Sequence, residues 1–436
     1  MYQEIAKLIM YGDIETSSIL VQMGELFRKF DEGKSERSEL IRMAYTQIKR
    51  ILTLGTEFGF DHNLWHNYLT YFLITNENPF SLTSEKVGVN DGSVNEFAKN
   101  DFQIMYQLFH YDFSTLEQQL QIDCFSKISD YRSIEKKELM YNKNVSEKVK
   151  GLSRKLEEAE SAEEFFVIIT EFYRQYGVGM FGLNKAFRIK RDVSDYGVTF
   201  LPINNMDQVV LTDLIGYEIQ KKKLVDNTLA FVQGKKANNV LLFGDSGTGK
   251  STSIKAIVNE FYEQGLRMIE IYKHQFQDLS NVIAAIKNRN YKFIIYMDDL
   301  SFEEFEIEYK FLKAVIEGGV ETRPDNILIY ATSNRRHLIK ETWNDRNDVE
   351  AVQGMHRSDT MQEKLSLVNR FGVQINYSKP SQNEYFEIVI ELAKKVGLQY
   401  SEEELKREAN KWELSHGGIS GRTAQQFVYY LQGGFV

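Results

Sequence analysis

The chain has 436 residues, more than one hydrophobic core usually organises, so we expect two or three domains. Its hydrophobic share of 42% and charged share of 26% are those of an ordinary soluble globular protein. The net charge of -9 disfavours a protein that coats nucleic acid by bulk electrostatics, although a local basic patch remains compatible with it.

The sequence lacks the usual marks of export or of a membrane protein. Cys124 is the single cysteine and cannot form an internal disulfide. No apolar run approaches the roughly 20 residues that span a bilayer, and Met1-Tyr2-Gln3-Glu4 lacks the basic region of a signal peptide. We therefore expect a cytoplasmic protein.

Residues 1–187 predict an all-helical domain. Pro79 is its only proline, and its apolar residues recur mainly at helical spacing, as in Ile19, Leu20, Met23, Phe27 and Phe30. We expect its clearest loop at 76–93 and a helix start at Ser161, which begins a capping box. Because little else in this domain indicates catalytic chemistry, we expect it to bind a partner or client.

His62 and His66 stand four residues apart, a spacing that metal ligands use on one helix face. A catalytic zinc site normally needs three protein ligands, and no third is evident. Asn63-Leu64 also replaces the glutamate of a metalloprotease motif. We therefore favour a surface or packing pair over a metal site.

Residues 188–210 are mixed and polar, so we expect a linker with a short extended piece. Its basic group Arg188-Ile189-Lys190-Arg191 is typical of a solvated face, with a contact to phosphate as the alternative.

Residues 211–379 predict an α/β nucleotide-binding core. Apolar strands alternate with helical segments, and we expect strands at 239–243, 268–272, 293–297, 327–331 and 373–375. This alternation indicates a doubly wound parallel sheet with helices on both faces, in which ligands bind at the carboxyl ends of the strands. Residues 380–436 predict a helical lid, with capping boxes that begin at Ser381 and Ser401.

A phosphate-binding motif follows the first of these strands. Gly244-Asp245-Ser246-Gly247-Thr248-Gly249-Lys250-Ser251 fits the pattern G-x-x-x-x-G-K-[ST], and the helix that contains Thr252 comes after it. The glycines let several backbone N–H groups converge on one anion at a helix N-terminus. We expect Lys250 to reach the β- and γ-phosphates and Ser251 to hold Mg²⁺. A chance glycine turn is the alternative, which the flanking strand and helix disfavour.

Two carboxylates end the strand 293–297, an arrangement that buried apolar strands rarely show unless a cation or substrate compensates the charge. We expect Asp298 to hold Mg²⁺ through water and Asp299 to polarise the water that attacks the γ-phosphate. Helix capping by the two acids is the competing interpretation, with Ser301 as an alternative capping residue.

Four further polar residues follow strands or lie at helix ends. Asn334 is suited to orient water or the γ-phosphate, with a simple turn or cap as the alternative. Arg335 and Arg336 open a helix, where the dipole disfavours cations, so we expect them to face a ligand or neighbour. Arg422 opens the last helix, and we regard it as a candidate γ-phosphate sensor.

Arg370 ends a helix just before the last strand. It either complements the helix dipole or projects to the phosphates of an adjacent subunit as an arginine finger.

The order of these motifs, followed by a helical lid, makes residues 211–436 resemble an AAA+ ATPase. More narrowly, the stretches 214–218, 239–245, 298–302 and 365–372 resemble a poorly characterised bacterial family of AAA+ ATP-binding proteins with a helical N-terminal region. Asp298-Asp299 in place of Asp-Glu belongs to that family's pattern.

The resemblance implies a nucleotide between core and lid, with Ile215 and Gly216 near the adenine. It also implies a ring or open spiral in which Arg370 acts in trans. Because Asp299 is one methylene shorter than the glutamate of many AAA+ proteins, we expect weak ATP hydrolysis.

The sequence thus predicts an oligomeric AAA+ ATPase that uses ATP and Mg²⁺ to remodel an unknown macromolecular client. Two alternatives stay open. One is a slow nucleotide switch or loader that holds ATP to recruit a partner. The other is a nucleic-acid-stimulated ATPase that uses Lys221-Lys222-Lys223 or Lys235-Lys236.

Overall fold

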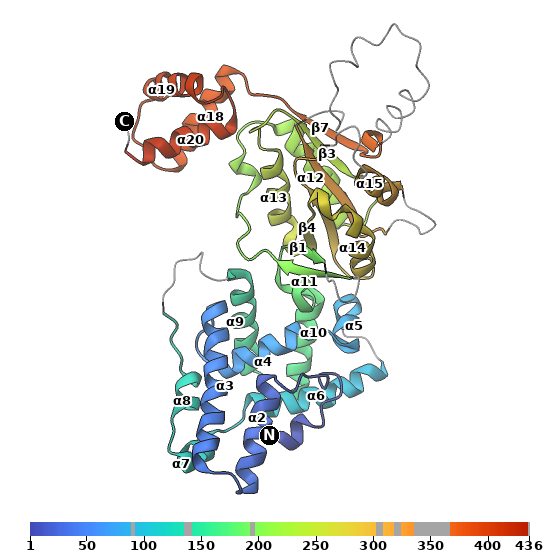
Figure 1. Ribbon diagram of the computed structural model, residues 1–436, viewed down its shortest axis with the longest axis vertical. Helices are drawn as coiled ribbons and strands as arrows, with labels where there is room; N and C mark the ends of the chain where they lie inside the picture. The colour runs from blue at the N-terminus through green and yellow to red at the C-terminus, as the bar shows by residue number, and fades with distance from the viewer. Residues whose placement is uncertain are drawn as a thin grey trace. The chain divides into compact units, whose positions relative to one another are not determined.

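The computed structural model describes residues 1–88, 92–134, 142–191, 197–301, 308–317, 324–334 and 367–434 (Figure 1). The chain divides into two compact units, Met1–Asn184 and Lys185–Val436. Arg335, Arg336 and the start of the run 365–372 lie outside the described residues, as does most of the alternative capping box that Ser301 begins.

The regular structure of the first unit is helical in its described residues, as predicted. Its helices are α1 (Tyr2–Ile5), α2 (Ile19–Glu32), α3 (Arg37–Phe58), α4 (Leu64–Thr75), α5 (Pro79–Val87), α6 (Ser93–Phe109), α7 (Ser114–Leu120), α8 (Cys124–Ser129), α9 (Lys143–Glu157), α10 (Ala162–Tyr176) and α11 (Gly179–Leu183). The core contains a cluster of aromatic side chains, in which the ring of Phe102 lies 5.6 to 5.7 Å from those of Tyr11, Phe80 and Phe166. The side chain of Ser161 accepts a hydrogen bond from Glu164 N and caps α10, as expected.

The loop expected at 76–93 is wrong over half its length, because α5 begins there at Pro79. A proline at the first helical position loses no hydrogen bond, since that N–H has no partner within the helix. Asn78 supplies the cap, and its side chain accepts a hydrogen bond from Ser81 N at 2.9 Å. A proline taken as a loop signal therefore marks a helix start.

His62 and His66 do not share a helix. His62 lies before α4 with a left-handed backbone (φ 65°), and its backbone pairs with Tyr131. His66 is buried, its ring stacks on Phe109, and its Nε2 lies 2.8 Å from Phe109 O. Both imidazoles approach Glu157, at 3.4 and 3.6 Å. Burial lowers the pKa of His66.

The second unit is built on a seven-stranded sheet of order β2-β1-β4-β5-β6-β3-β7. Its strands are β1 (Ala186–Arg191), β2 (Val198–Pro202), β3 (Val240–Gly244), β4 (Leu266–Glu270), β5 (Lys292–Met297), β6 (Ile327–Ser333) and β7 (Val373–Tyr377). All neighbouring strands are parallel except β1 and β2. The doubly wound parallel sheet predicted from the sequence is confirmed.

The prediction of a linker at 188–210 is wrong for its first part, because β1 and β2 belong to the sheet; the short extended piece expected within the linker is β2. The basic group lies on β1, which pairs in parallel with β4 and antiparallel with β2. Phe187 and Ile189 are buried, whereas the residues between and after them are exposed. Burial that alternates from residue to residue is typical of a half-buried strand. The basic group consists mostly of charged residues, which made the strand hard to recognise from the sequence.

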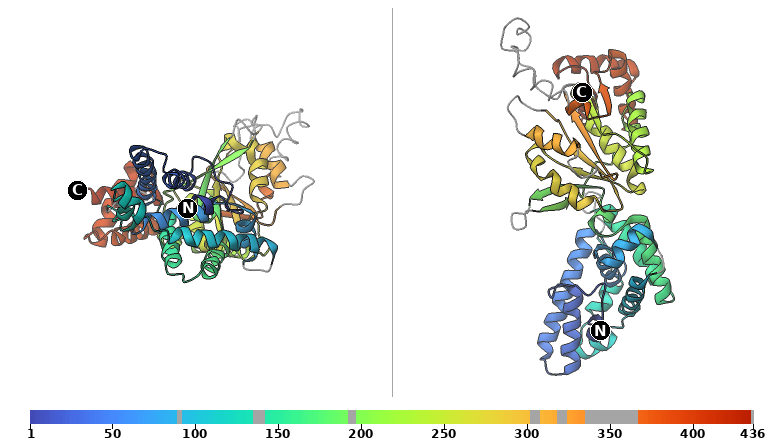
Figure 2. Two further views of the ribbon diagram at one scale, coloured as in Figure 1. Left: turned by 90° about the horizontal axis from the view of Figure 1, so that it is seen from below. Right: turned by 90° about the vertical axis from the view of Figure 1, so that its right-hand side faces the viewer.

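Helices cover both faces of the sheet (Figure 2). They are α12 (Glu218–Val232), α13 (Lys250–Phe261), α14 (Leu279–Ile286) and α15 (Glu308–Glu317), with 3-10 turns at Leu211–Asp213, Tyr262–Gln264 and Lys273–Asp278. α12 and α13 share a core with alternate residues of the strands, for example Leu224 and Ile257 with Val240 and Leu242. Within the described residues, no helix is long and apolar enough to cross a membrane.

The lid consists of α18 (Gln382–Lys395), α19 (Glu402–Ser415) and α20 (Gly421–Gln432). The capping boxes predicted at Ser381 and Ser401 are both present. Tyr385, Val389, Leu405 and Phe427 belong to a separate small core that holds the three helices together. The lid is therefore a distinct layer of the second unit.

Candidate nucleotide-binding site

The phosphate loop connects the end of β3 at Gly244 to the start of α13 at Lys250. Gly249 has a φ of +91°, and a Cβ there would lie 2.5 Å from Leu214 Cδ2. Gly244 has a φ of +131°, and a Cβ there would lie 2.2 Å from Tyr377 O. Both positions need glycine, because a side chain would be strained and would collide with the structure. Both ends of the loop thus have backbone conformations that residues other than glycine do not adopt readily.

Lys250 is buried, and its ammonium group is surrounded by oxygen atoms. It donates to Gly244 O at 2.9 Å, to Asp245 O at 2.6 Å and to Asn334 Oδ1 at 3.1 Å. Burial lowers the pKa of Lys250, and the carboxylates of Asp245, Asp299 and Asp298 oppose that shift. The loop therefore holds a cation ready at the amino end of α13.

Ser251 and Asp298 meet across the ends of α13 and β5. The Ser251 hydroxyl donates to Asp298 Oδ1 at 2.7 Å, and the Thr332 hydroxyl donates to the same oxygen at 2.6 Å. Partial burial opposes ionisation of Asp298, but the hydroxyls around it outweigh that effect and hold the pKa of the carboxyl below its usual value. Asp298 is therefore ionised near neutral pH.

A hydroxyl and a carboxylate side by side are the kind of oxygen ligands that Mg²⁺ takes beside nucleotide phosphates. Ser251 and Asp298 therefore fit the metal expected from the sequence. The buried hydroxyl of Tyr296 lies next to this pair and has no well-formed hydrogen bond among the described residues. Burial and the charge of Asp298 raise the pKa of Tyr296.

Asp299 and Asn334 form a second pair at the same edge of the sheet. Asp299 has a left-handed backbone (φ 50°), and its N–H donates to Thr332 Oγ1 at 2.9 Å. Asn334 Nδ2 donates to Asp299 Oδ1 at 2.8 Å. Because ammonium only donates and carboxylate only accepts, the Asn334 amide can bridge Lys250 and Asp299 in one orientation only. Asn334 thus connects the phosphate loop to the acidic strand end.

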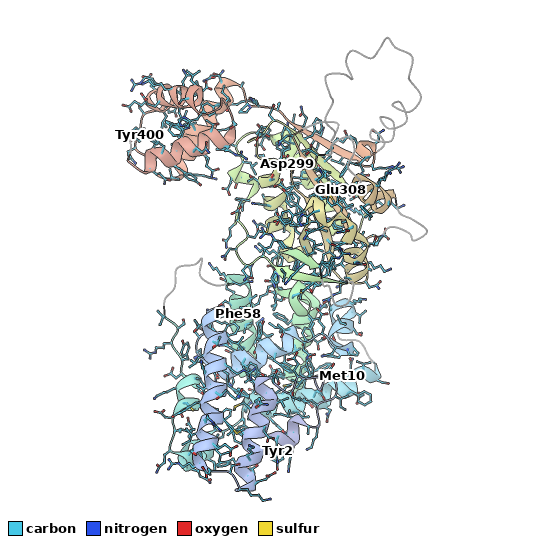
Figure 3. The ribbon with its side chains drawn as sticks, in the orientation of Figure 1. Tyr2, Met10, Phe58, Asp299, Glu308 and Tyr400 are labelled. Carbon is cyan, nitrogen blue, oxygen red and sulfur yellow. The ribbon has the colours of Figure 1, made fainter. Side chains whose placement is uncertain are left out.

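These groups line one cavity of about 680 Å³ between the sheet and the lid. Figure 3 labels Asp299 at the end of the sheet nearer the lid. The polar part of the lining is Ser246, Gly247, Thr248, Gly249, Lys250, Ser251, Thr252, Asp298, Asp299, Thr332, Asn334, Gly421, Arg422 and Gln425. The rest of the lining is Val209, Leu214, Ile215, Tyr217, Ile388 and Leu392, together with the charged pair Asp213 and Lys395. Phosphate-binding and apolar surfaces therefore share one cavity, as a nucleotide requires.

The lid contacts the phosphate loop directly. Arg422 N donates to Gly247 O at 3.2 Å, so the first turn of α20 lies on the loop. Two helix N-termini, those of α13 and α20, therefore converge on one region and favour an anion there. The positive charge of Arg422 also acts on Lys250 and helps to lower its pKa.

Most of the predicted site residues line the cavity, but four do not. Ile215, Asp298, Asp299, Asn334, Arg422 and residues 246–252 are brought together. Gly216, Gly244, Asp245 and Arg370 are not among the lining residues. Asp245 is turned away from the cavity, and its Oδ2 accepts the N–H of Lys379 at 2.9 Å.

The strand register places Arg370 far from the phosphate loop of its own chain. β7 runs parallel to β3, with Val373 opposite Val240 and Tyr377 opposite Gly244. Arg370 precedes Val373, so the length of β7, about 13 Å, separates it from the level of the loop. Its side chain is exposed at that far edge.

The sequence placed the nucleotide between core and lid, but it did not identify Ile388 and Leu392 of α18 as part of the cavity wall. Their spacing of four shows a shared helix face but not which surface that face covers. Thr332, which lies two residues before Asn334, was not identified either.

The sequence and structure were compared with those of known proteins. No curated protein matches the sequence. Among solved structures, the RuvB Holliday junction branch migration motor of Thermotoga maritima has a TM-score of 0.36 at 16% identity, over 51% of this chain and 64% of that one. The FIGL-1 AAA domain in complex with ADP has a TM-score of 0.37 at 18% identity, over 52% of this chain and 73% of that one.

The second unit has a phosphate loop after β3, an inner strand of a mostly parallel sheet, together with a helical lid, the arrangement that the resemblance to AAA+ ATPases implies. Residues 183–435 match a family described as a protein of unknown function, DUF815. This match covers more than half of the 436 residues and begins close to the start of the second unit. The chain therefore belongs to the DUF815 family, whose members are described as proteins of unknown function.

Proposed function

We propose that this protein is an ATPase that binds ATP and Mg²⁺ between the sheet and the lid and hydrolyses ATP at a site shared by two subunits. The observation that carries the proposal is the convergence of Lys250, the Ser251–Asp298 pair and the Asp299–Asn334 pair in one cavity. A nucleotide-binding protein without hydrolysis has less need of a second carboxylate there.

In this proposal Lys250 exchanges its carbonyl partners for phosphate oxygens of ATP. Ser251 and Asp298 hold Mg²⁺, which when bound supplies charge neutralisation of the β- and γ-phosphates. Arg422 at the start of α20 contacts the γ-phosphate and makes the lid's position depend on it. The apolar residues Ile215, Ile388 and Leu392 enclose the base.

Asp299 acts on the water that attacks the γ-phosphorus. The water oxygen bonds to phosphorus as the bond to the bridging oxygen breaks, and Asp299 accepts the proton that the water loses. The hydrogen bond from Asn334 fixes the orientation of the Asp299 carboxylate. Because aspartate is short and one of its oxygens is engaged, we expect slow turnover.

Arg370 acts in trans in this proposal. The register of β7 with β3 supports this role, because Arg370 precedes the amino end of β7, whereas the phosphate loop of the same chain lies beside its carboxyl end. A neighbouring subunit that presents Arg370 to the cavity completes the charge stabilisation of the γ-phosphate. We therefore propose a closed ring or open spiral of copies, with the helical first unit binding a macromolecular client that the motor remodels.

Steady-state ATP hydrolysis with Mg²⁺ across a range of protein concentrations tests the proposal. We expect specific activity to rise with concentration, and we expect Lys250→Ala, Asp299→Asn and Arg370→Ala each to abolish it. If specific activity does not change with protein concentration and the Arg370→Ala variant stays active, the site is not shared between subunits. If the protein binds ATP but does not hydrolyse it at any protein concentration, the motor proposal fails and the nucleotide switch takes its place.

The switch is the second candidate, and the engaged Asp299 favours it. One oxygen of that carboxylate already accepts a hydrogen bond from Asn334, and its backbone is left-handed. Nucleic-acid stimulation has less support, because Lys221 and Lys222 form ion pairs with Glu218 and Asp226. A rise in hydrolysis on addition of DNA that collapses with salt would revive it.

A further inference from the structure

Helix α18 forms one wall of the nucleotide cavity and is held at both of its ends. Just before its first turn, the backbone that leaves β7 is fixed by the hydrogen bond from Lys379 N to Asp245, and we call this connection the hinge. Its last residue, Lys395, pairs with Asp213 of the core. Fourteen residues of helix span about 20 Å, so a small rotation at the hinge displaces the Lys395 end by a larger distance.

The cavity face of α18 ends at this ion pair. Ile388, Leu392 and Lys395 follow the spacing i, i+4, i+7, which places them on one helix face, and all three line the cavity. Lys395 also lies at the carboxyl end of the helix, where the dipole favours a cation. The cavity-lining face of α18 therefore ends at a lysine whose charge the helix dipole stabilises.

The backbone of Val210 positions the Asp213 carboxylate for this partner. It ends the 3-10 turn Leu211–Asp213, directly before Leu214 and Ile215, which also line the cavity. Its Oδ2 accepts the N–H of Val210 at 2.9 Å, which leaves Oδ1 for the lysine. Lys395 and then Val210 N hold the pKa of the Asp213 carboxyl below its usual value, so it is charged near neutral pH.

The pair is weak enough to open. The side chains of Lys395 and Asp213 are 47% and 39% exposed, and exposed pairs are screened by water and salt. Such a pair biases the lid toward the closed position without locking it. A lid that must open at every exchange of nucleotide requires this balance.

We propose that Asp213 and Lys395 are positioning residues that latch the lid over the base of the bound nucleotide and slow its release. The proposal rests on the nucleotide-binding function proposed above. Because the latch adjoins the apolar part of the cavity and not the phosphate loop, it retains ADP and ATP alike. Arg422, in contrast, favours the triphosphate.

Release of ribose-labelled fluorescent ATP and ADP from the full chain, followed by stopped flow, tests the latch. We expect Lys395→Ala to speed release of both nucleotides about two- to fivefold, as expected for a partly exposed pair. Lys395→Glu should speed release further through repulsion from Asp213. Combining Lys395→Glu with Asp213→Lys should bring the rate back toward that of the wild type.

Lys394→Ala is the matched control, because Lys394 is the neighbouring exposed lysine and pairs with Glu391 and Glu402 within the lid. We expect it to leave release unchanged, and we expect the effect of Lys395→Ala to shrink as salt rises. Release at the wild-type rate from Lys395→Glu, or equal acceleration by Lys394→Ala, would overturn the latch while nucleotide binding stands. Absence of nucleotide binding by the wild type would overturn the proposed function and the latch with it.

Discussion

Thr332→Val tests the hydrogen bonds that hold Asp298 and Asp299 at the end of β5. Valine has nearly the shape of threonine but lacks the hydroxyl that donates to Asp298 Oδ1 at 2.6 Å and accepts from Asp299 N at 2.9 Å. Thr332 is 2% exposed, so water cannot easily replace either bond. A hydrogen bond to a charged group contributes about 1.5–3 kcal/mol, and a buried N–H left unpaired costs about 1–3 kcal/mol.

Because Asp298 keeps contact with solvent and with Ser251, we take the lower part of these ranges. We expect the free energy of unfolding to fall by about 2–3 kcal/mol, measured by urea denaturation of the second unit's transition. Thr332→Ser keeps the hydroxyl and serves as the control. Equal stability of the valine and serine variants would refute the assigned hydrogen bonds.

The stability difference between wild type and Thr332→Val should also depend on pH, in a direction that follows from the pKa of Asp298. The pKa of Asp298 is lowered in the folded state, so its contribution to stability is present above the unfolded pKa, near 3.9, and is lost as pH falls through the folded pKa. Thr332 is the main source of that lowering. The gap in stability between wild type and Thr332→Val should therefore stay constant from pH 6 to 8 and narrow below about pH 4.

Three further predictions address the phosphate loop and its partners. Gly249→Ala should destabilise the fold by about 1–3 kcal/mol and weaken ATP binding, because the new Cβ meets Leu214; Gly397→Ala, at a positive φ with open space around it, should cost less in the same urea titration. Asn334→Ala should retain ATP binding by fluorescence titration but lose at least about tenfold in kcat, and an unchanged kcat would show that Asp299 needs no orientation. Arg370→Ala should bind ATP with wild-type affinity while losing hydrolysis, and weakened binding with normal kcat would place the arginine in its own site.

The chemistry-bearing residues of the site could be predicted because their positions follow strands. Lys250, Asp298 and Asn334 each come just after a strand or its loop, and parallel strands bring their carboxyl ends to one edge. Apolar runs revealed those strands directly. The location of the site at the carboxyl ends of the strands then followed from general rules of α/β sheets, whereas the order of the strands was not predicted.

The parts that the sequence did not reveal depend on contacts between distant elements. β1 carries Arg188 and Lys190, whose charges concealed a strand with only alternate residues buried. Leu392 and Lys395 were not identified as cavity residues, because helical spacing does not show whether a helix face covers the lid's own core or the nucleotide cavity. The turn of Asp245 toward Lys379 depends on where the chain leaves β7, and no local pattern reports that position.

The most direct test of the account mixes two inactive variants. Asp299→Asn keeps Arg370 but lacks the water-activating carboxylate, and Arg370→Ala keeps an intact acidic site but lacks the arginine. If the active site is shared between subunits, an equimolar mixture should contain interfaces that combine the intact parts, and it should hydrolyse ATP well above the sum of the separate variants. A mixture that hydrolyses no faster than that sum, at concentrations where the wild type is active, would contradict a shared site.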